Sequence, residues 1–378
     1  MTMANNKEKK VLNVPNLRFP EFTDKWEAGK LEEYILLVSG QDLSSEQYTD
    51  KEDVYPYITG ASSLNSEGII LNRWTHTPTQ IVKRGDILLV CKGSGVGQLT
   101  VLSNVDKAHI ARQIMGIRAK NTESQLFIYH YLSRLMTELK KRSTGIIPGI
   151  DRKSILSLHI SIPSLQEQQK VAELLSLIEQ RIITQNKIIE DLKKLKSAIS
   201  ERLFKSVKGS TVLLSDLCDI VKGKQINGEN LSDSGNYYVM NGGTEPSGYY
   251  DNYNVAASTI SISEGGNSCG YVQFNTSPFW SGGHCYSIQN IADKVDNMYL
   301  YHYLKSNEDA IMKLRIGSGL PNIQKKDLAM FKIIVPKIEW QIKISTFLSS
   351  LERKAEIEER IQNVMQKKKL YLLQQMFI

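Results

Sequence analysis

The sequence predicts an α+β protein in which two β-rich domains form a pseudo-two-fold repeat and are joined by two long helices that pair as an antiparallel coiled coil. The first observation is that a helical stretch, 165–204, recurs with similar apolar spacing at 338–377. The second is that a β-rich region precedes each copy. The third is registration, because Pro163 and Pro336, which close the two β-rich regions, are separated by the same offset as Phe204 and Phe377. A period this long indicates duplicated domains rather than a solenoid of small repeats.

The bulk composition fits two folded domains and excludes global disorder. The chain has 378 residues, enough for two domains of roughly 100–200 residues each. Hydrophobic residues make up 41% of it, which is sufficient for packed cores. The net charge is +7, from 47 Lys and Arg against 40 Asp and Glu. This mildly basic balance is compatible with a phosphate-bearing partner but does not by itself indicate one.

The cysteines and the apolar runs indicate the compartment. The four cysteines, Cys91, Cys218, Cys269 and Cys285, lack the spacing of metal ligands and the density of a disulfide framework. They are typical of reduced thiols, and we expect no metal site. The opening MTMANNKEKK is charged with no apolar stretch behind it, which is unlike a signal peptide. No apolar run approaches the ~18 residues that span a bilayer. We therefore expect a cytoplasmic protein with no membrane partner.

The elements of the first half can be taken in order. A flexible tail, 1–13, is polar and rich in lysine. Short apolar or β-branched runs bounded by Gly, Asn or Asp then predict strands and turns, as in YPYITG from Tyr55 and GDILLVCKGSG from Gly85. From Gln125, apolar residues at three- and four-residue steps predict an amphipathic helix. A Gly/Pro break and a strand that ends at Pro163 lead into the long helix.

The second half repeats this order. The offset between His130 and His302 nearly equals that between the two prolines, whereas Gly60 and Gly242 are separated by a longer interval. The back of each repeat is therefore tightly registered, and the front has diverged by insertion, as expected for a shared scaffold with variable loops. The predicted boundaries are 14–164 for the first β-rich domain, 165–207 for the first long helix, 208–337 for the second domain and 338–378 for the second long helix.

Each long helix carries an apolar seam. A stripe this wide favours packing against a partner helix, and the other copy is the obvious partner. Gln185 and Glu358 place a polar residue in each mid-seam, which can fix the register. Each helix would be roughly 60 Å long at ~1.5 Å per residue. In the alternative, each helix is an ordinary surface helix on its own domain. The predicted seam is Val171, Leu174, Leu175, Ile178, Ile182, Gln185, Ile189, Leu192, Ile199, Leu203, Ile344, Phe347, Leu348, Leu351, Ala355, Glu358, Ile361, Met365 and Leu372.

Motifs for catalysis are missing. KGSGVGQ, from Lys92, is rich in glycine but has neither the order of a phosphate-binding loop nor G-x-G-x-x-G spacing. The six histidines contain no H-E-x-x-H, and the serine between glycines is not in G-x-S-x-G. His130 and His302 recur in matched Tyr-His-Tyr-Leu segments, which favours shared packing. No Asn-Pro-Pro-Tyr-like segment or carboxylate cluster followed by Glu-x-Lys is present. We expect no catalytic residue in this chain.

Loops rich in Gly, Ser, Thr and Asn fall at equivalent places in the two domains. Small residues let backbone N–H groups approach phosphates, and hydroxyl and amide groups can bond base edges. As a matched set, the loops and their neighbouring cations favour a binding face, although any single residue can equally be solvated surface. The candidates for DNA binding are Thr59, Gly60, Ser62, Lys92, Ser94, Gly95, Arg112, Arg142, Thr144, Gly145, Lys222, Lys224, Asn241, Gly242, Gly243, Asn267, Arg315, Ser318 and Gly319.

Together these features resemble the specificity subunit of a type I restriction-modification system. The resemblance rests on the opening NVPNLRFPEFTDKWE, on the paired segments IPSLQEQQKVAELLSLIEQRI and VPKIEWQIKISTFLSSLERKAEIEERI, and on the turns TGIIPGI and GSGLPNI. It covers nearly the whole chain. The second copy departs from the first, since Glu339, Trp340 and Ile342 replace Gln166, Glu167 and Gln169 at positions expected to contact a partner.

The resemblance implies a division of labour. Each β-rich domain would be a target recognition domain that reads one half of a bipartite double-stranded DNA target, and the coiled coil would act as a ruler. Two modification (methyltransferase) subunits and restriction (translocase/nuclease) subunits would be the partners. S-adenosylmethionine, ATP and Mg²⁺ would be cofactors of those partners, with none in this chain. The assembled complex would methylate adenine N6 and cleave DNA with ATP. The alternatives are a self-contained methyltransferase or nuclease with unrecognised motifs, or an interaction scaffold without DNA.

Overall fold

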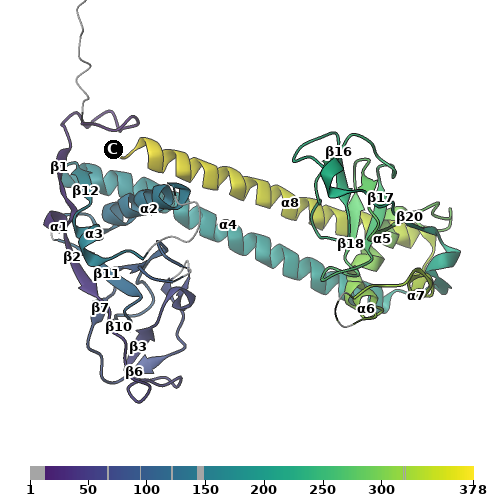
Figure 1. Cartoon of the computed structure of the whole chain (residues 1–378), viewed down its shortest axis with the longest axis horizontal. Helices are drawn as coiled ribbons and strands as arrows, with labels where there is room; N and C mark the ends of the chain where they lie inside the picture. Colours follow the sequence, from purple (N-terminus) through teal and green to yellow (C-terminus); the bar gives the residue numbers. More distant parts are fainter. Residues whose placement is uncertain are drawn as a thin grey trace, which may run out of the picture. The chain divides into compact units, whose positions relative to one another are not determined.

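The computed structural model divides into two compact units. The N-terminal unit comprises 1–186 with 360–378, and the C-terminal unit comprises 187–359. Each unit contains one β-rich domain and part of both long helices (Figure 1). The structure describes residues 13–65, 68–93, 95–120, 122–142, 149–317, 319 and 321–378, with 138–142 described by their backbone only. All of the predicted tail except Asn13 lies outside this range.

The N-terminal unit is built on two four-stranded sheets with strand orders β2-β11-β8-β9 and β6-β3-β10-β7. Two short pairs, β1-β12 and β4-β5, complete it, and α2 packs beside the long helices (Figure 1). The elements are β1 (Glu27–Lys30), α1 (Leu31–Tyr34), β2 (Ile35–Ser39), β3 (Tyr55–Ile58), β4 (Leu64–Asn65), β5 (Gly68–Ile69), β6 (Trp74–Thr75), β7 (Ile81–Lys83), β8 (Ile87–Val90), β9 (Leu99–Val101), β10 (Lys107–Ile110), β11 (Ile114–Ala119), α2 (Gln125–Arg142), α3 (Arg152–Leu156) and β12 (His159–Ile162).

The C-terminal unit repeats the main sheet as β14-β20-β17-β18, and its second sheet is β16-β15-β19. The pair β13-β21 takes the place of β1-β12. The elements are β13 (Ser210–Leu213), β14 (Asp219–Lys222), β15 (Tyr237–Met240), β16 (Tyr249–Tyr250), β17 (Thr259–Ser263), β18 (Val272–Asn275), β19 (Trp280–Ser281), β20 (Cys285–Gln289), α5 (Asn297–Ser306), α6 (Glu308–Met312), α7 (Lys325–Ala329) and β21 (Lys332–Val335).

The repeat extends to strand direction. The pairs in the two main sheets are all antiparallel. In the second sheets, β3 pairs parallel with β10, and β15 pairs parallel with β19. Among the described residues, β7 has no counterpart in the C-terminal unit. The predicted fold class, an α+β repeat of two β-rich domains with two long helices, is confirmed.

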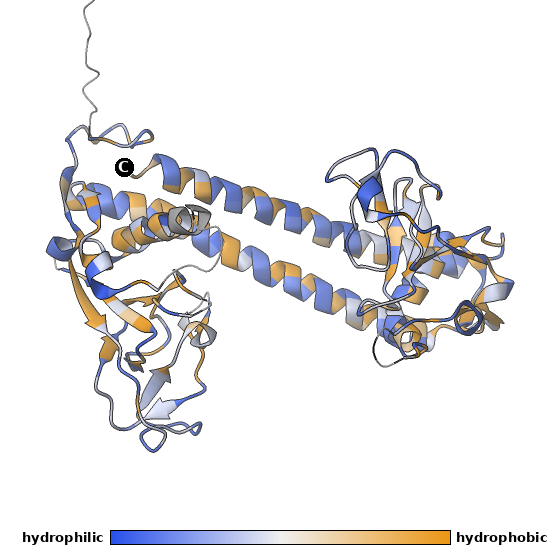
Figure 2. Ribbon diagram, in the orientation of Figure 1, coloured by the Kyte–Doolittle hydropathy of each residue, from blue (hydrophilic) through white to orange (hydrophobic). Residues whose placement is uncertain are grey.

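The long helices are α4 (Leu165–Ser206) and α8 (Ile338–Gln375). They run antiparallel within each unit. In the C-terminal unit, Lys193 pairs with Glu359 and Lys196 pairs with Glu352, both at 2.6 Å, so the residue numbers rise in α4 as they fall in α8. In the N-terminal unit, the pairs that bridge α4 and α8 follow the same reversed order, with Asn186 bonded to Gln362 and Glu179 bonded to Lys369. The helices mix polar and apolar residues throughout (Figure 2).

Most of the predicted seam lies against protein. The exceptions are Phe347 and Ile361, whose side chains are 46% and 39% exposed. Phe347 precedes the fully buried Leu348, and adjacent helical residues point about 100° apart. Ile361 precedes Gln362, which faces α4, so Ile361 is turned away from that helix. The buried or half-buried seam residues are Val171, Leu174, Leu175, Ile178, Ile182, Gln185, Ile189, Leu192, Ile199, Leu203, Ile344, Leu348, Leu351, Ala355, Glu358, Met365 and Leu372.

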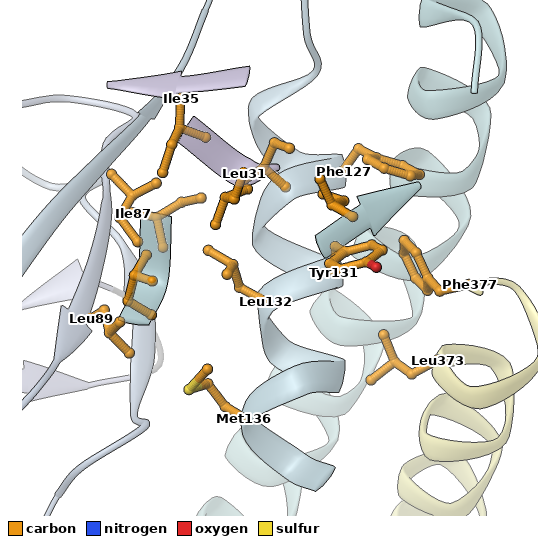
Figure 3. Close-up of a cluster of buried hydrophobic side chains, with 14 of the residues drawn as sticks. Leu31, Ile35, Ile87, Leu89, Phe127, Tyr131, Leu132, Met136, Leu373 and Phe377 are labelled. Atoms are coloured by element: carbon orange, nitrogen blue, oxygen red, sulfur yellow. The ribbon is translucent and has the colours of Figure 1, made fainter. Parts of the chain in front are cut away.

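Each long helix ends in an aromatic cluster. In the N-terminal unit, Phe377 lies 5.1 Å from Phe127 and 5.4 Å from Tyr131 between ring centroids. Figure 3 shows Phe377 and Leu373 beside these α2 side chains, with Leu132 on the far side of α2 facing the sheet. In the C-terminal unit, Phe204 at the end of α4 packs on Tyr299 and Tyr303 of α5. The last turn of each helix therefore belongs to a hydrophobic core.

A glutamine near the start of each long helix fixes the entry of the chain. Gln168 is buried, and its Oε1 accepts from the backbone N–H of Ser124 at 2.9 Å while its Nε2 donates to the Pro163 carbonyl at 3.0 Å. Gln341 makes the equivalent bonds, accepting from the Asp296 N–H and donating to the Pro336 carbonyl, both at 2.8 Å. A buried amide that is satisfied on both sides is costly to replace, because each backbone partner would lose its bond.

A glutamate joins three helices in each unit. In the N-terminal unit, Glu179 of α4 accepts from the Tyr129 hydroxyl of α2 at 3.0 Å and from Lys369 of α8 at 2.6 Å. In the C-terminal unit, the roles of the long helices are exchanged. Glu352 of α8 accepts from Tyr301 of α5 at 3.1 Å, and its lysine partner lies on α4 at 2.6 Å.

The two matched histidines serve packing, as the sequence indicates. The Nε2 atom of His130 lies 3.0 Å from the Ser176 hydroxyl, and that of His302 lies 2.9 Å from the Ser349 hydroxyl. Burial lowers the pKa of each imidazole from 6.5 to about 4. Each ring is therefore neutral in the folded protein at neutral pH, and neither is placed as a proton donor.

This depression makes stability depend on pH. Because the folded pKa lies below the unfolded one, the unfolded chain binds the proton first, so stability is full above about pH 6.5 and is lost as pH falls toward 4. Each histidine contributes a slope of up to about 1.4 kcal/mol per pH unit in that window. We expect His302→Gln to lose less unfolding free energy between pH 7 and pH 5 than the parent chain, measured by urea unfolding. His159→Gln, at an exposed histidine, is the control and should follow the parent chain. An equal loss in His302→Gln would contradict the assignment.

Candidate nucleic-acid interface

The same backbone bonds build one edge of the main sheet in both units. In the N-terminal unit, Cys91 follows β8, and its N–H donates at 2.8 Å to the carbonyl of Gln113, which precedes β11. In the C-terminal unit, Glu264 follows β17, and its N–H donates at 2.9 Å to the carbonyl of His284, which precedes β20. The two edges are therefore equivalent, and each carries loops that the sequence predicts to bind.

A further segment closes each edge. Ile150 donates to the Cys91 carbonyl and Ile323 donates to the Glu264 carbonyl, both at 2.8 Å. The two isoleucines are separated by the same offset as Pro163 and Pro336, which is the period of the repeat. The C-terminal part of each repeat, where the offset is nearly constant, thus contacts the loops of the N-terminal part, where the two sequences have diverged.

In the N-terminal unit, the structure brings several predicted residues together. A methyl group added to Gly95 would lie 2.3 Å from the Ala61 Cβ, so the loops around Gly60 and Lys92 touch, and only glycine fits there. Arg112 enters the same edge, and its Nε lies 2.7 Å from Asp42. Both Arg112 and Lys92 are exposed.

The first loop is internally braced. The Thr59 hydroxyl lies 3.2 Å from that of Ser63, and Ser62 between them is exposed. Gly60 packs beside Gln113, since a methyl group there would lie 2.6 Å from the Gln113 Oε1. The loop therefore lies against Gln113 at Gly60 and carries the exposed Ser62.

In the C-terminal unit, Lys222 ends β14, and its Nζ lies 2.7 Å from Glu264 Oε1. The Asn241 side chain accepts from the His284 N–H at 3.1 Å. Gly242 has a φ of +84°, which favours glycine, and its carbonyl accepts from the Ser263 hydroxyl at 2.6 Å. Gly243 follows in the same loop.

Two further loops lie beside this edge. An isolated bridge between Gly265 and Asn322 holds their segments together. The first segment carries Asn267, and the second carries Arg315 and Gly319; all three are exposed. Lys224 is also exposed, and its N–H donates to the Ser281 carbonyl at 2.9 Å. Ser94, Thr144, Gly145, Ser318 and the side chain of Arg142 lie outside the described residues.

Sequence reasoning missed three residues at these edges: Gln113, Glu264 and His284. All three adjoin runs of the kind that selected the candidates, since Glu264 opens the run that contains Asn267, Gln113 follows Arg112, and His284 follows two glycines. A usable signal was their place in the repeat, because each either follows or precedes a central strand of the main sheet. The strand register, which brings these positions together, is not visible in one sequence.

The four cysteines are free and buried, which confirms that they are not paired. Burial raises the pKa of Cys285 to about 11 and that of Cys218 to about 12, so their thiols stay protonated at neutral pH. Within the described part of the chain, no group of three or more His, Cys, Asp or Glu side chains could hold a metal ion. Nor is any described helix long and apolar enough to cross a membrane.

Comparison with known proteins identifies the class. The family described as the type I restriction modification DNA specificity domain matches residues 23–194 and again 208–367. The chain therefore belongs to this family, with one copy of the family domain in each repeat. It acts in DNA recognition and is a non-catalytic component of a type I restriction-modification system, as the sequence resemblance implies.

Individual relatives agree. The specificity subunit of the type I restriction enzyme MjaVIII from Methanocaldococcus jannaschii is 25% identical over 406 aligned positions, which cover 96% of this chain and 94% of the relative. The crystal structure of a type I S subunit from M. genitalium has a TM-score of 0.70 at 18% identity, covering 97% and 99% of the two chains. A chain from a study of complex assembly and conformational transition of the type I R-M system has a TM-score of 0.57 at 16% identity, covering 92% and 96%. These two structures show the shared fold.

The exposed cations at the edges generate a prediction. Lys92→Ala combined with Lys224→Ala should weaken binding to duplex DNA across sequences, because each lost phosphate contact removes counterion release. The slope of log K against log salt should become shallower by about 0.9 for each contact. Fluorescence anisotropy of the full chain with its partner subunits, at several salt concentrations, measures this. Lys332→Ala, at an exposed lysine of β21, should leave the slope unchanged. An unchanged slope in the double variant would remove these lysines from the interface.

Proposed function

We propose that this chain reads a bipartite DNA target, with each β-rich domain recognising one half-sequence. The observation that carries this is the pair of equivalent sheet edges, built on the same backbone bonds but carrying different side chains. Equivalent scaffolds predict equivalent docking on duplex DNA. Different side chains at the edges predict different bases, because base edges are read by side-chain hydrogen bonds while phosphate contacts fix position.

The long helices serve as the spacer in this proposal. Each runs without a break between its described bounds, and an α-helix rises ~1.5 Å per residue, so a change in its length translates directly into distance. The antiparallel ion pairs within each unit, Lys193 with Glu359 and Lys369 with Glu179, oppose slippage of one helix along the other. A fixed register supports a fixed gap between the half-sequences.

The exposed sides of the helices would dock two methyltransferase subunits. Large apolar side chains that cover no core are concentrated on α8 and are fewer on α4, and exposed apolar groups of this kind mark interaction surfaces. Trp340 is 58% exposed where the first repeat has the buried Glu167, so the two docking surfaces are not identical. The exposed large apolar residues on α8 are Ile338, Trp340, Ile342, Phe347, Ile357, Ile361, Val364, Leu370 and Tyr371, and on α4 they are Leu165, Leu177, Ile188 and Leu195.

The chemistry would lie entirely in the partners. Methyltransferase subunits would use S-adenosylmethionine to methylate adenine N6, and restriction subunits would use ATP and Mg²⁺ to translocate and cleave DNA. The assembly would work in the cytoplasm, where the DNA and these cofactors are found. This chain would recognise the target sequence and hold the partner subunits together.

Exchange of one domain tests the two-reader proposal. Replacing residues 14–160 by those of another family member should change one half of the methylated motif and leave the other half intact, because each half is read within one unit. Methylome sequencing of a host that carries the partner subunits measures this. A host without the gene is the control and should lose the motif, and a change in both halves would refute separate reading.

A change in helix length tests the spacer. Inserting one helical turn into α4 beside Gln185, and one turn at the matching position beside Glu358 in α8, should alter the gap in the motif while both half-sequences stay the same. The paired insertion keeps the two helices of equal length. Methylome sequencing again gives the answer, with an Asp191→Asn variant of unchanged length, at an exposed residue of α4, as the matched control. Altered half-sequences at an unchanged gap would show that the helices do not set the distance.

A further inference from the structure

One polar cluster distinguishes the edge of the C-terminal unit from its counterpart. Lys222 ends β14, Glu264 follows β17 and His284 precedes β20, so three neighbouring antiparallel strands bring them to the same edge. The Lys222 Nζ lies 2.7 Å from Glu264 Oε1, and the His284 Nδ1 lies 3.9 Å from Glu264 Oε2. The carboxylate thus stands between two nitrogen-bearing side chains.

The carboxylate is fixed, and the two side chains beside it are open. Glu264 is only 6% exposed, and the hydroxyl of the buried Tyr286 donates to its Oε1 at 3.0 Å. Burial and the Glu264 charge raise the pKa of the Tyr286 phenol, which keeps it a donor. The side chains of Lys222 and His284 are 54% and 62% exposed. A rigid anion therefore holds the Lys222 ammonium, the His284 ring lies beside the same carboxylate, and solvent or a ligand can reach both side chains.

The three equivalent residues in the N-terminal unit are uncharged, and the cation beside them, Arg152, bonds the Ser39 hydroxyl at 3.3 Å rather than a carboxylate. The shared backbone bonds match Cys91 with Glu264 and Gln113 with His284. Strand pairing matches Ser39 with Lys222, since Met115 pairs with Ser39 as Tyr286 pairs with Lys222. The scaffold is kept, whereas the carboxylate between a lysine and a histidine is found at the edge of the C-terminal unit and not at the matching positions. A structural requirement of the fold would appear in both.

We infer that Lys222 and His284 contact the acceptor edge of a guanine in the half-sequence read by the C-terminal unit, and that Glu264 is a positioning residue. This inference rests on the proposed function. Lysine pairs with guanine O6 and N7 in the major groove. The neighbouring carboxylate offsets the lysine charge, which disfavours a phosphate, yet it leaves the N–H donors that a base acceptor needs. Gly242 and Gly265 lie beside the cluster and allow a close approach.

The test uses the full chain assembled with its modification subunits. Lys222→Met and His284→Ala should each relax one position in the half-motif of the C-terminal domain, with preference for G·C there falling about 10- to 100-fold. Glu264→Gln should relax the same position by a smaller factor, because the Tyr286 bond can persist while the anchoring charge is lost. Methylome sequencing gives the motif, and exchange of 208–337 identifies which half belongs to this domain. The other half should not change.

Lys332→Met is the matched control, since it makes the same substitution at an exposed lysine of the same unit, on β21. Thermal unfolding of each variant confirms that it folds. A uniform loss of methylation with the motif preserved would overturn the inference, because it would mark a backbone contact, and an unchanged motif would overturn it as well. If exchange of 208–337 still altered one half-sequence, the proposed function would stand without this cluster.

Discussion

The arrangement of each unit depends on one half-buried carboxylate that binds three helices. Glu179 and Glu352 each accept from a tyrosine of the domain helix and from a lysine of the opposite long helix. A charge in this position is costly to leave unpaired, so loss of either donor would be felt by all three helices. Because the tyrosine belongs to the domain and the lysine to the partner helix, the bond sets domain orientation and helix register together. The glutamate lies on α4 in the N-terminal unit and on α8 in the C-terminal unit, so the interaction follows the symmetry of the repeat.

The two repeats differ at one position near the start of each long helix. Glu167 is buried in the N-terminal unit and is neutralised by Arg18, whose two nitrogens lie 2.7 Å from its oxygens, with Trp26 as a further donor. The segment that carries these partners therefore packs on the start of α4. In the C-terminal unit the same position is Trp340, which is exposed and needs no counter-charge. An apolar surface replaces a buried ion pair, and this is the clearest departure from symmetry on the long helices.

The parts of the structure that follow from periodicity could be predicted. The nearly constant offset between the two copies locates both long helices, the matched histidines and the polar mid-seam residues, because these depend on local helical spacing. The prediction that Phe347 and Ile361 belong to the seam was wrong, because residue spacing alone does not define which side of a helix faces its neighbour. The candidate loops were found from composition. Gln113, Glu264 and His284 were not, because their meeting depends on strand register between segments far apart in sequence, and the front halves have diverged too far for a constant offset to align them.

The aromatic residue at the end of each long helix has a consequence for synthesis on the ribosome. Residues 187–359 form one contiguous unit, so its core can assemble as soon as they have emerged. The other unit takes in 360–378, and its core includes Leu373 and Phe377. The domain translated first is thus completed last, and until then its α2 surface lacks the residues that cover Phe127 and Tyr131. Such an intermediate exposes apolar surface and is open to aggregation or to chaperones. A stop codon shortly before the codon for Leu373 would damage a domain encoded far upstream of it.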